Sequence, residues 1–209
     1  RIAKFLSNAG HCSRREAEKL IRNKKVFINN QVCSHPSEKV SDLDTIRIDQ
    51  KIIKIEKEIQ LWKLHKPIKY ICSSKDNFKR KKIFDLLPKN FPKLISIGRL
   101  DYMSEGLLLL TNSGEYSRYL ELPSSKIERI YRVGVKGKVN KYNLTKINKG
   151  IKIDKIIYKQ VNVIKEKEKD NISWLIFKLK EGKNREIRKI CNFFSWNIIK
   201  LIRISFGPY

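Results

Sequence analysis

The chain opens with two segments whose apolar residues recur at helical spacing. The first covers residues 2–9 and is followed by Gly10, in the position that commonly ends a helix. Ser13 and Glu16 then have the spacing of a capping box, and the apolar stripe behind them predicts a second helix that reaches about Asn23. Each segment has one apolar face and one polar face, so we expect both helices to cover a small common core.

Alternation of apolar and polar residues follows the two helices. The segment VFINNQVC alternates around an Asn-Asn pair, which predicts a β-hairpin, and DTIRID predicts another short strand. We therefore expect residues 1–48 to form a small domain of two helices and a sheet. Residues 49–58 are charged and predict a linker, and residues 59–209 predict a second, larger domain.

Strand patterns predominate in the larger domain. We expect helices over residues 114–121 and 183–196, a short amphipathic turn over residues 83–88, and strands over residues 59–67, 93–101, 106–111, 128–137, 173–182 and 198–208. This order predicts an α+β chain in which a mixed, mainly antiparallel sheet is flanked by helices. The polar and basic segment at residues 73–82 shows no periodicity, and it predicts either a disordered loop or a loop that clamps a nucleic acid.

The charge of the chain indicates a polyanionic partner. Forty-seven Lys and Arg residues against twenty-one Asp and Glu give a formal net charge of +26. A nucleic acid would balance that charge, although drift in genome base composition or binding to anionic lipid are alternative explanations. No apolar run approaches the roughly 20 residues of a membrane-spanning helix, and no signal peptide is recognised. We therefore expect a cytoplasmic protein without a membrane partner.

The cysteine and histidine residues do not have the spacing of a metal site. Cys12, Cys33, Cys72 and Cys191 form no C-x-x-C pair, and the three histidines supply no further ligand spacing. We expect no metal and no small-molecule cofactor. The cysteines are expected to be free thiols packed as small apolar side chains.

Asp101 is the strongest candidate for chemistry. It follows an apolar segment in GRLDYMSEGLLLLTN and precedes the four leucines 107–110, so we expect it to be desolvated and to need a cation. The late helical segment offers Lys183, Arg185, Arg188 and Lys189, and an arginine fork would keep the carboxylate ionised and oriented. Spacing alone leaves open whether such a pair is catalytic or only joins two elements.

The first 48 residues resemble the S-four-type (alpha-L) RNA-binding domain, through the order of the first helix, SRREAEKLI and the strand VFIN. In this resemblance the basic residues of the second helix contact RNA, and these are Arg14, Arg15, Lys19 and Arg22. A solvated helix face is the alternative reading of the same four residues.

Three ordered motifs resemble the pseudouridine synthases of the RsuA/RluB/RluE/RluF group: GRLDYMSEGLLLLTNSGE, IERIYRVGVKG and EGKNREIRKICNFFSWNIIKLIRISFG. The RluB branch, which acts on large-subunit ribosomal RNA, is the most similar. The resemblance implies an enzyme that converts one uridine of ribosomal RNA to pseudouridine without a cofactor. It implies Asp101 as the catalytic carboxylate, Tyr131 as the residue that stacks on the target base, and Arg188 as the partner of the aspartate.

The same resemblance implies further RNA-binding residues around the site, namely Arg99, Lys183, Asn184 and Arg185. Arg185 and Arg188 are the two candidates for the partner of Asp101. Most of the four leucines 107–110 are expected to belong to an ordinary core strand, and one or two of them to face the base and exclude water from the pocket. The expected partner is ribosomal RNA or a pre-ribosomal particle, and the protein is expected to be a monomer.

Three other functions stay open at this level. The target can lie in small-subunit (16S) rather than 23S ribosomal RNA. The protein can be a non-catalytic RNA-binding or ribosome-assembly factor. It can also be a glycosidase-like hydrolase that uses Asp101 and Glu105 as a carboxylate pair and releases free uracil.

Overall fold

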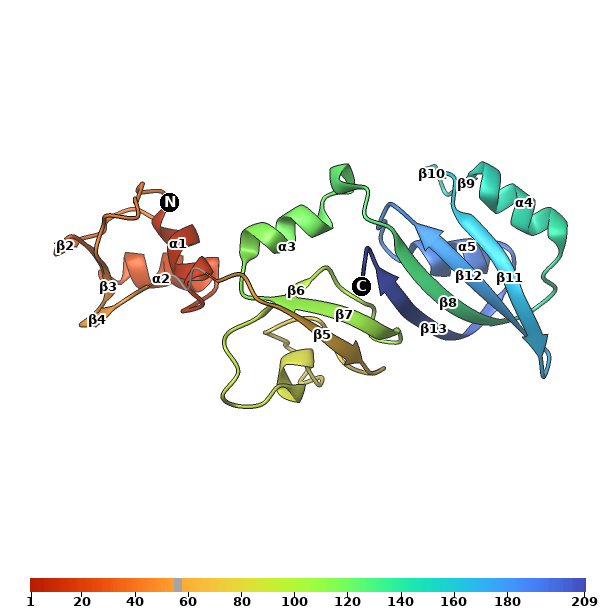
Figure 1. Cartoon of the computed structure of the whole chain (residues 1–209), viewed down its shortest axis with the longest axis horizontal. Helices are drawn as coiled ribbons and strands as arrows, with labels where there is room; N and C mark the ends of the chain where they lie inside the picture. The colour runs from red at the N-terminus through yellow and green to blue at the C-terminus, as the bar shows by residue number, and fades with distance from the viewer. Residues whose placement is uncertain (55–57) are drawn as a thin grey trace. The chain divides into compact units, whose positions relative to one another are not determined.

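The computed structural model describes residues 1–54 and 58–209 (Figure 1). The two predicted N-terminal helices are confirmed as α1 (Ile2–Asn8) and α2 (Arg14–Arg22). Ser13 caps α2 as its sequence predicts: the Ser13 hydroxyl accepts a hydrogen bond from the Glu16 backbone N–H at 3.3 Å, and the Glu16 carboxylate accepts one from the Ser13 N–H at 2.8 Å.

A four-stranded sheet packs with these helices. It consists of β1 (Val26–Ile28), β2 (Gln31–Val32), β3 (Ile46–Ile48) and β4 (Lys51–Ile52) in the order β2-β1-β3-β4. The predicted Asn-Asn hairpin joins β1 and β2, and both asparagines adopt the left-handed conformation that a two-residue turn requires, with φ of 48° and 70°.

The small core of this region contains only side chains from residues 2–53. Its buried members are Ile2, Ala3, Leu6, Cys12, Ala17, Ile21, Val26, Cys33, Ile46, Ile48 and Ile53. Strand β4 and Ile53 belong to this fold although they lie in the segment predicted as a linker, because β4 pairs with β3. Residues 55–57 of that predicted linker lie outside the described residues.

The larger sheet has seven strands. Their bounds are β5 (Leu61–Lys66), β6 (Ile95–Ile97), β7 (Glu105–Thr111), β8 (Arg129–Lys136), β11 (Asn162–Lys169), β12 (Ile172–Leu179) and β13 (Asn197–Phe206). The order is β11-β12-β8-β13-β7-β5, and β6 pairs with β7. Strand β13 runs parallel to β7, whereas β11, β12, β8 and β13 pair antiparallel, which confirms the predicted mixed sheet.

The remaining elements are α3 (Gly114–Glu121), α4 (Lys141–Lys149), β9 (Ile151–Ile153), β10 (Ile156–Tyr158) and α5 (Glu186–Phe193), with short 3-10 turns at Ile83–Leu86 and Pro123–Ser125. The sequence predicted no element between residues 138 and 172, where α4, β9, β10 and β11 lie. Strand β11 reads NVIKEKEK and is exposed almost along its whole length, so it lacks the apolar alternation by which a strand is recognised.

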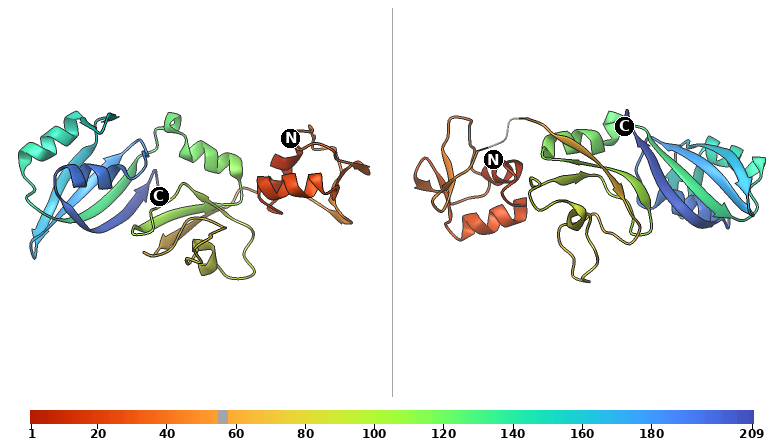
Figure 2. Two further views of the ribbon diagram at one scale, coloured as in Figure 1. Left: turned by 180° about the vertical axis from the view of Figure 1, so that it is seen from behind. Right: turned by 60° about the horizontal axis from the view of Figure 1, so that its bottom comes forward.

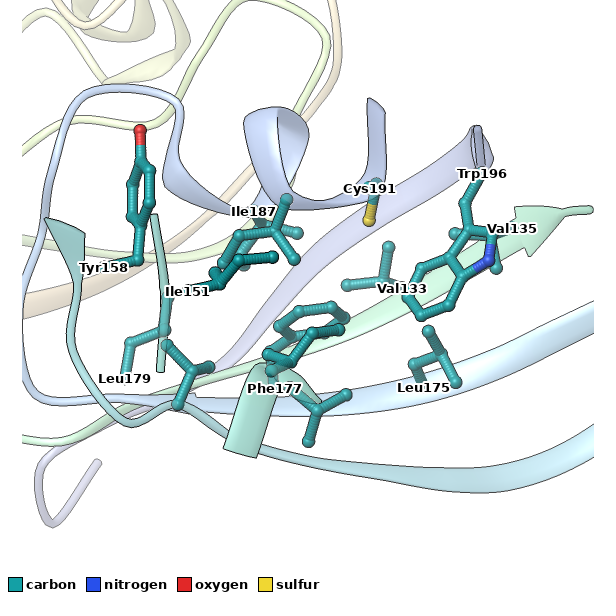
Figure 3. Close-up of a cluster of buried hydrophobic side chains, with 14 of the residues drawn as sticks. Val133, Val135, Ile151, Tyr158, Leu175, Phe177, Leu179, Ile187, Cys191 and Trp196 are labelled. Atoms are coloured by element: carbon teal, nitrogen blue, oxygen red, sulfur yellow. The ribbon is translucent and has the colours of Figure 1, made fainter. Parts of the chain in front are cut away.

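One face of the sheet carries the main core. Apolar residues of β8, β12 and β13 pack there against Leu144 and Ile147 of α4 and against Ile187, Ile190 and Cys191 of α5. Figure 3 shows Ile187 and Cys191 of α5 above Phe177 and Val133 of the sheet, and Figure 2 shows α5 lying along these strands. The end of this face that the helices leave uncovered carries the polar residues described below.

Backbone contacts divide the chain into two compact units, residues 1–62, 88–95 and 110–118 on one hand, and residues 63–87, 96–109 and 119–209 on the other. The second unit contains all residues of the cavity described below. Across residues 1–54 and 58–209, none of the helices combines the length and apolar character needed to span a bilayer.

Candidate active site

Asp101 lies in a tight turn between β6 and β7. The predicted strand over residues 93–101 stops at Ile97, so Asp101 is not at the end of a strand as predicted. The Asp101 carbonyl accepts a hydrogen bond from the Ser104 N–H at 3.0 Å, which closes the turn. The Asp101 side chain retains 33% of its accessible surface, so it is less desolvated than predicted and the carboxylate can be reached from the cavity.

Lys66, at the end of β5, binds the backbone of this turn. Its side chain is wholly buried, and its ammonium donates to the carbonyls of Pro67 at 3.0 Å, Asp101 at 3.1 Å and Ser104 at 2.7 Å. Burial lowers the pKa of Lys66, while Cys72, Asp101 and Glu105 oppose that shift. Sequence reasoning missed Lys66, because a single lysine in HKP gives no sign that its amine lies inside the protein.

Two arginines approach the Asp101 carboxylate. Arg188 Nε donates to Asp101 Oδ2 at 3.0 Å, while Arg185 Nη1 lies 3.9 Å from the same oxygen. The Nη2 atom of Arg188 also donates to the Met103 carbonyl and the Ser104 hydroxyl, both at 2.9 Å. Arg188 therefore fixes both the carboxylate and its turn, and Arg185 contributes a weaker, more exposed charge.

The position of Arg188 follows from the start of α5. Arg185 precedes the helix in the left-handed conformation, with φ of 54°, and Glu186 begins the helix with a buried side chain that accepts from the Lys183 N–H at 3.1 Å. Burial raises the pKa of Glu186. One turn later, Ile187, Ile190 and Cys191 face the core while Arg188 lies on the side toward Asp101.

Tyr131, from the middle of β8, lines the same cavity as Asp101. This cavity has a volume of about 730 Å³, and its lining also includes Arg99, Asn184 and Arg185. The structure thus brings five of the predicted residues together around one cavity. Arg188 lines a smaller adjoining cavity of about 80 Å³ together with Asp101, Ser104 and Tyr131.

The leucines 107–110 belong to the core, as expected for most of them, and the prediction that one or two face the cavity is wrong. Leu108, Leu109 and Leu110 are wholly buried in the sheet, and none of the residues 107–110 lines either cavity. Apolar side chains from other elements border the smaller cavity beside Asp101, namely Leu100, Leu179, Ile187 and Leu201. These four residues are far apart in the sequence, so no local pattern predicts that they meet. The run of four leucines is explained by a central strand that is buried on both faces.

Arg129 and Arg203 also line the large cavity and were not singled out from the sequence. Arg203 of β13 lies opposite Tyr131 of β8, and Phe206 lies opposite Arg129. Both guanidinium groups lie over the ring of Phe206, at 4.9 Å for Arg129 and 5.1 Å for Arg203. Arg129 lies two residues before Tyr131 on the same strand, whereas only the pairing of β13 with β8 brings Arg203 beside Tyr131.

The segment predicted as a basic loop borders the cavity through Ser73, Lys75, Asp76 and Arg80. Asp76 orders it, because its carboxylate accepts from the backbone N–H groups of Phe78 and Arg80 and pairs with the Arg80 guanidinium. These hydrogen bonds, with the Arg80 side chain first among the causes, lower the pKa of Asp76 to about 2. The loop therefore has a defined turn at its centre.

The other predicted RNA-binding residues lie outside the cavity. Arg14, Arg15, Lys19 and Arg22 are all exposed on α2, where Arg22 lies 3.7 Å from Glu18. The amine of Lys183 is turned away, since it pairs with Glu181 at 2.6 Å and donates to the Ile157 carbonyl at 2.7 Å. All four cysteines are free thiols, as predicted. In the described part of the chain no three His, Cys, Asp or Glu side chains cluster closely enough to hold a metal ion.

Comparison with known proteins places this geometry in a family. The model of the RNA pseudouridylate synthase family matches residues 60–193, and that of the S4 domain matches residues 1–46. A Rickettsia typhi protein named as an uncharacterized RNA pseudouridine synthase is 43% identical over 207 residues, which cover 99% of this chain and 85% of the relative. Ribosomal large subunit pseudouridine synthase B of Bacillus subtilis is 35% identical over 211 residues, which cover 99% of this chain and 85% of that protein.

A solved crystal structure of a pseudouridylate synthase has the same fold. It superimposes with a TM-score of 0.68 at 25% sequence identity, and the match covers 100% of this chain and 89% of the other. The matched models, the relatives and the fold agree with one another. The chain belongs to the RNA pseudouridylate synthase family and carries an N-terminal S4 domain.

Proposed function

We propose that this protein isomerises one uridine of large-subunit ribosomal RNA to pseudouridine, with Asp101 as the catalytic carboxylate. The observation that carries the proposal is the placement of a reachable carboxylate, bound by Arg188 at 3.0 Å, in the same cavity as Tyr131. The ribosomal target is supported by relatives named as ribosomal large subunit pseudouridine synthase B, such as that of Bacillus subtilis.

The target uridine must leave the RNA stack, because a carboxylate cannot reach the sugar of a paired and stacked nucleotide. Tyr131 is half-buried and borders the cavity, so its ring is placed to replace part of the lost stacking. Stacking on an aromatic side chain contributes about 1–3 kcal/mol per base.

Asp101 acts at the sugar. The carboxylate either attacks C1′ or removes a sugar proton, and in both cases the C1′–N1 bond breaks while the base stays in the cavity. The ring then turns and forms a new bond from C5 to C1′. Arg188 positions Asp101 by binding one carboxylate oxygen, the Met103 carbonyl and the Ser104 hydroxyl. The bond broken and the bond formed join the same two fragments, so the isomerisation consumes no co-reactant and we propose that it requires no cofactor.

The apolar side chains Leu100, Leu179, Ile187 and Leu201 keep water from the bond that is broken. In such a site the detached ring rejoins the sugar before water can capture it. Glu105 does not support the hydrolase alternative, because it pairs with Lys200 at 3.0 Å and does not line the cavity.

We propose that the region predicted as residues 1–48 binds the RNA through its phosphates. The basic residues of α2 are exposed, and the S4 match covers the same region. Residues 59–209 then form the catalytic domain, and the protein acts as a cytoplasmic monomer on ribosomal RNA or a pre-ribosomal particle.

The proposal is tested with large-subunit and small-subunit ribosomal RNA that lack pseudouridine. Each RNA is incubated with the protein or with Asp101→Asn, and pseudouridine is mapped by chemical labelling. We expect one modified uridine in the large-subunit RNA and none with Asp101→Asn. Modification of the small-subunit RNA instead would show that the target lies in that RNA. Release of free uracil would favour a hydrolase. Binding without conversion of uridine would indicate a non-catalytic RNA-binding protein.

A further inference from the structure

Two buried arginines share one face of the sheet with Tyr131. Strands β8 and β13 run antiparallel with Arg203 opposite Tyr131 and Phe206 opposite Arg129. Opposed side chains of such a pair project from the same face, so the four residues form one patch. All four line the cavity that contains Asp101.

Among the described residues, the two guanidinium groups are buried without a carboxylate in direct contact, and Glu121, which lines the same cavity, attracts Arg129 only at longer range. Arg203 is 2% exposed and Arg129 is 8% exposed. Arg203 Nε donates to the Leu107 carbonyl at 2.6 Å, and Arg129 Nη2 donates to the Leu120 carbonyl at 3.2 Å. Over residues 1–54 and 58–209 neither forms an ion pair with a carboxylate, although buried arginines are normally paired.

One donor of this pair has no acceptor. Arg203 Nη2 is buried and makes no hydrogen bond with the described part of the chain. Gly182 also borders the cavity, and a Cβ added to it would lie 3.7 Å from Arg129 Nη1. Because glycine has no side chain, nothing at this position separates the Arg129 guanidinium from the cavity. Unsatisfied buried donors are rare in folded proteins, and each calls for an explanation such as strain, a bound water, an ion or a substrate group.

The partner must be an oxygen acceptor that enters the cavity largely desolvated. A phosphate on the RNA backbone stays near the surface, where exposed arginines such as Arg99 and Arg185 lie. The extruded base is the part of the substrate that goes deeper, and uracil presents the carbonyl oxygens O2 and O4. A planar guanidinium is well suited to such oxygens.

We propose that the Arg129–Arg203 pair binds a carbonyl oxygen of the extruded uracil and stabilises the negative charge that the ring carries between its detachment and its reattachment. This inference rests on the proposed function. When the C1′–N1 bond breaks, its electron pair stays on the ring and is delocalised onto O2 and O4. At the same time Asp101 either forms an ester bond to C1′ or removes a proton from the sugar. When C5 bonds to C1′, the ester bond to Asp101 breaks or, on the other route, Asp101 returns the proton to the sugar. C5 then loses its proton and N1 takes one up, so Asp101 is regenerated and the product is an isomer of the substrate.

The pair would act mainly on the rate of the chemical step. A cation beside a carbonyl stabilises the anionic ring more than neutral uridine, and such differential stabilisation raises kcat. Removing one preorganised donor of this kind typically lowers kcat by about 10²–10³-fold. For Arg129→Gln we therefore expect a loss of roughly this size with KM changed less than about threefold.

Arg132→Gln is the matched control. Arg132 follows Tyr131 on the same strand but projects from the opposite face, where it pairs with Glu166 at 2.7 Å and lies 4.7 Å from the centre of the Trp174 ring. Arg203→Gln also loses the bond to Leu107, and Arg129→Gln loses the bond to Leu120, so Arg203→Lys and Arg129→Lys are measured beside them. Thermal unfolding of each variant separates a loss of rate from a loss of fold.

The experiment measures kcat and KM for these variants on the RNA that the unaltered protein modifies. A second series replaces O2 or O4 of the target uridine by sulfur, which accepts hydrogen bonds poorly. We expect one of the two thio substitutions to slow the unaltered protein and to have little further effect on Arg129→Gln, because both changes remove the same hydrogen bond.

Each outcome separates the inference from the function on which it rests. If the unaltered protein forms pseudouridine but Arg129→Gln and Arg203→Lys behave as Arg132→Gln does, the role of the pair is overturned and the function stands. A raised KM with unchanged kcat and a weaker salt dependence would assign the pair to a phosphate and also overturn it. If the unaltered protein forms no pseudouridine, the function and the role of the pair fall together.

Discussion

Arg188 and Arg185 lie near the same carboxylate oxygen but differ in contact. Arg188 lies 3.0 Å from Asp101 Oδ2 with 18% of its side chain exposed, whereas Arg185 lies 3.9 Å away with 57% exposed. An exposed, longer pair contributes little, because solvent screens it. We therefore expect Arg188→Gln to lower kcat by about 10²-fold or more and Arg185→Gln by less than about tenfold. Equal losses in single-turnover pseudouridine formation would show that the partner of Asp101 was wrongly assigned.

Lys66 is the other single residue on which the turn depends. Replacing it by Met removes the ammonium donor from the carbonyls of Pro67, Asp101 and Ser104, and of these the Asp101 carbonyl keeps the Ser104 N–H. Because a buried unsatisfied polar group costs about 1–3 kcal/mol, we expect Lys66→Met to lower the free energy of unfolding by on the order of 3 kcal/mol. Urea denaturation measures this loss. Lys63→Met, an exposed lysine on the same strand, is the control and should change stability by less than about 0.5 kcal/mol.

Glu186 makes stability depend on pH. Burial raises its pKa above the ordinary value of 4.5, so the folded state holds the proton more tightly than the unfolded state. The stability contributed by the protonated group is complete below pH 4.5 and is lost as pH rises through the folded pKa. Glu186→Gln stays neutral and keeps an acceptor for the Lys183 N–H. Its stability relative to the unaltered protein should therefore increase from pH 4 to pH 7, and a constant difference in unfolding midpoint would contradict this.

At the scale of elements, the parallel pairing of β7 with β13 brings two backbones unusually close together. Gly106 of β7 pairs with Arg203 of β13 and has a φ of +104°. A Cβ at this position would overlap the Arg203 carbonyl oxygen and lie 2.8 Å from the Arg203 nitrogen. The glycine therefore permits the close approach of β7 to the backbone of Arg203 on β13.

Gly106→Ala should consequently separate these strands. We expect a loss of on the order of 3 kcal/mol in unfolding free energy, from steric overlap and from the left-handed backbone together. Gly98→Ala is the matched control, because φ is +67° there but nothing lies within 4 Å of the added Cβ. It should lose only the backbone contribution of about 1–2 kcal/mol. If chemical denaturation gave equal losses of unfolding free energy for Gly106→Ala and Gly98→Ala, the close approach of the two strands would not contribute to the cost of the substitution.

The sequence predicted most helices and strands because their signals are local. The capping box at Ser13, the Asn-Asn turn and the alternation of SWLIFKL each need only neighbouring residues. The signals fail where the neighbours are uninformative. The lysine-rich strand β11 has no apolar alternation, and the segment before Asp101 looks like one strand although Gly98 ends it in the left-handed conformation.

For the whole molecule, the net charge of +26 predicts RNA binding that weakens steeply with salt. If the α2 residues contact phosphates, replacing Arg14, Arg15 and Lys19 by Gln should reduce the slope of log affinity against log salt by about 2–3. Filter binding of ribosomal RNA over a range of salt measures the slope. The control variant loses the same number of charges from exposed lysines of the other unit, through replacement of Lys141, Lys149 and Lys152 by Gln. An equal change of slope in both variants would mean that the α2 residues make no specific phosphate contacts and that only the overall charge of the protein attracts RNA.

The sequence by itself determined the elements of the N-terminal fold, the mixed sheet, the basic character and the three motifs that carry the family, because these depend on residue type and local spacing. Only the tertiary structure decided how closely each arginine approaches Asp101, that the amine of Lys66 binds the backbone of the turn, and that none of the leucines 107–110 lines the cavity. It also revealed Arg129 and Arg203 beside Tyr131. Their proximity is created by the pairing of β8 with β13, and strand register between distant segments follows from packing of the whole core and not from any local pattern.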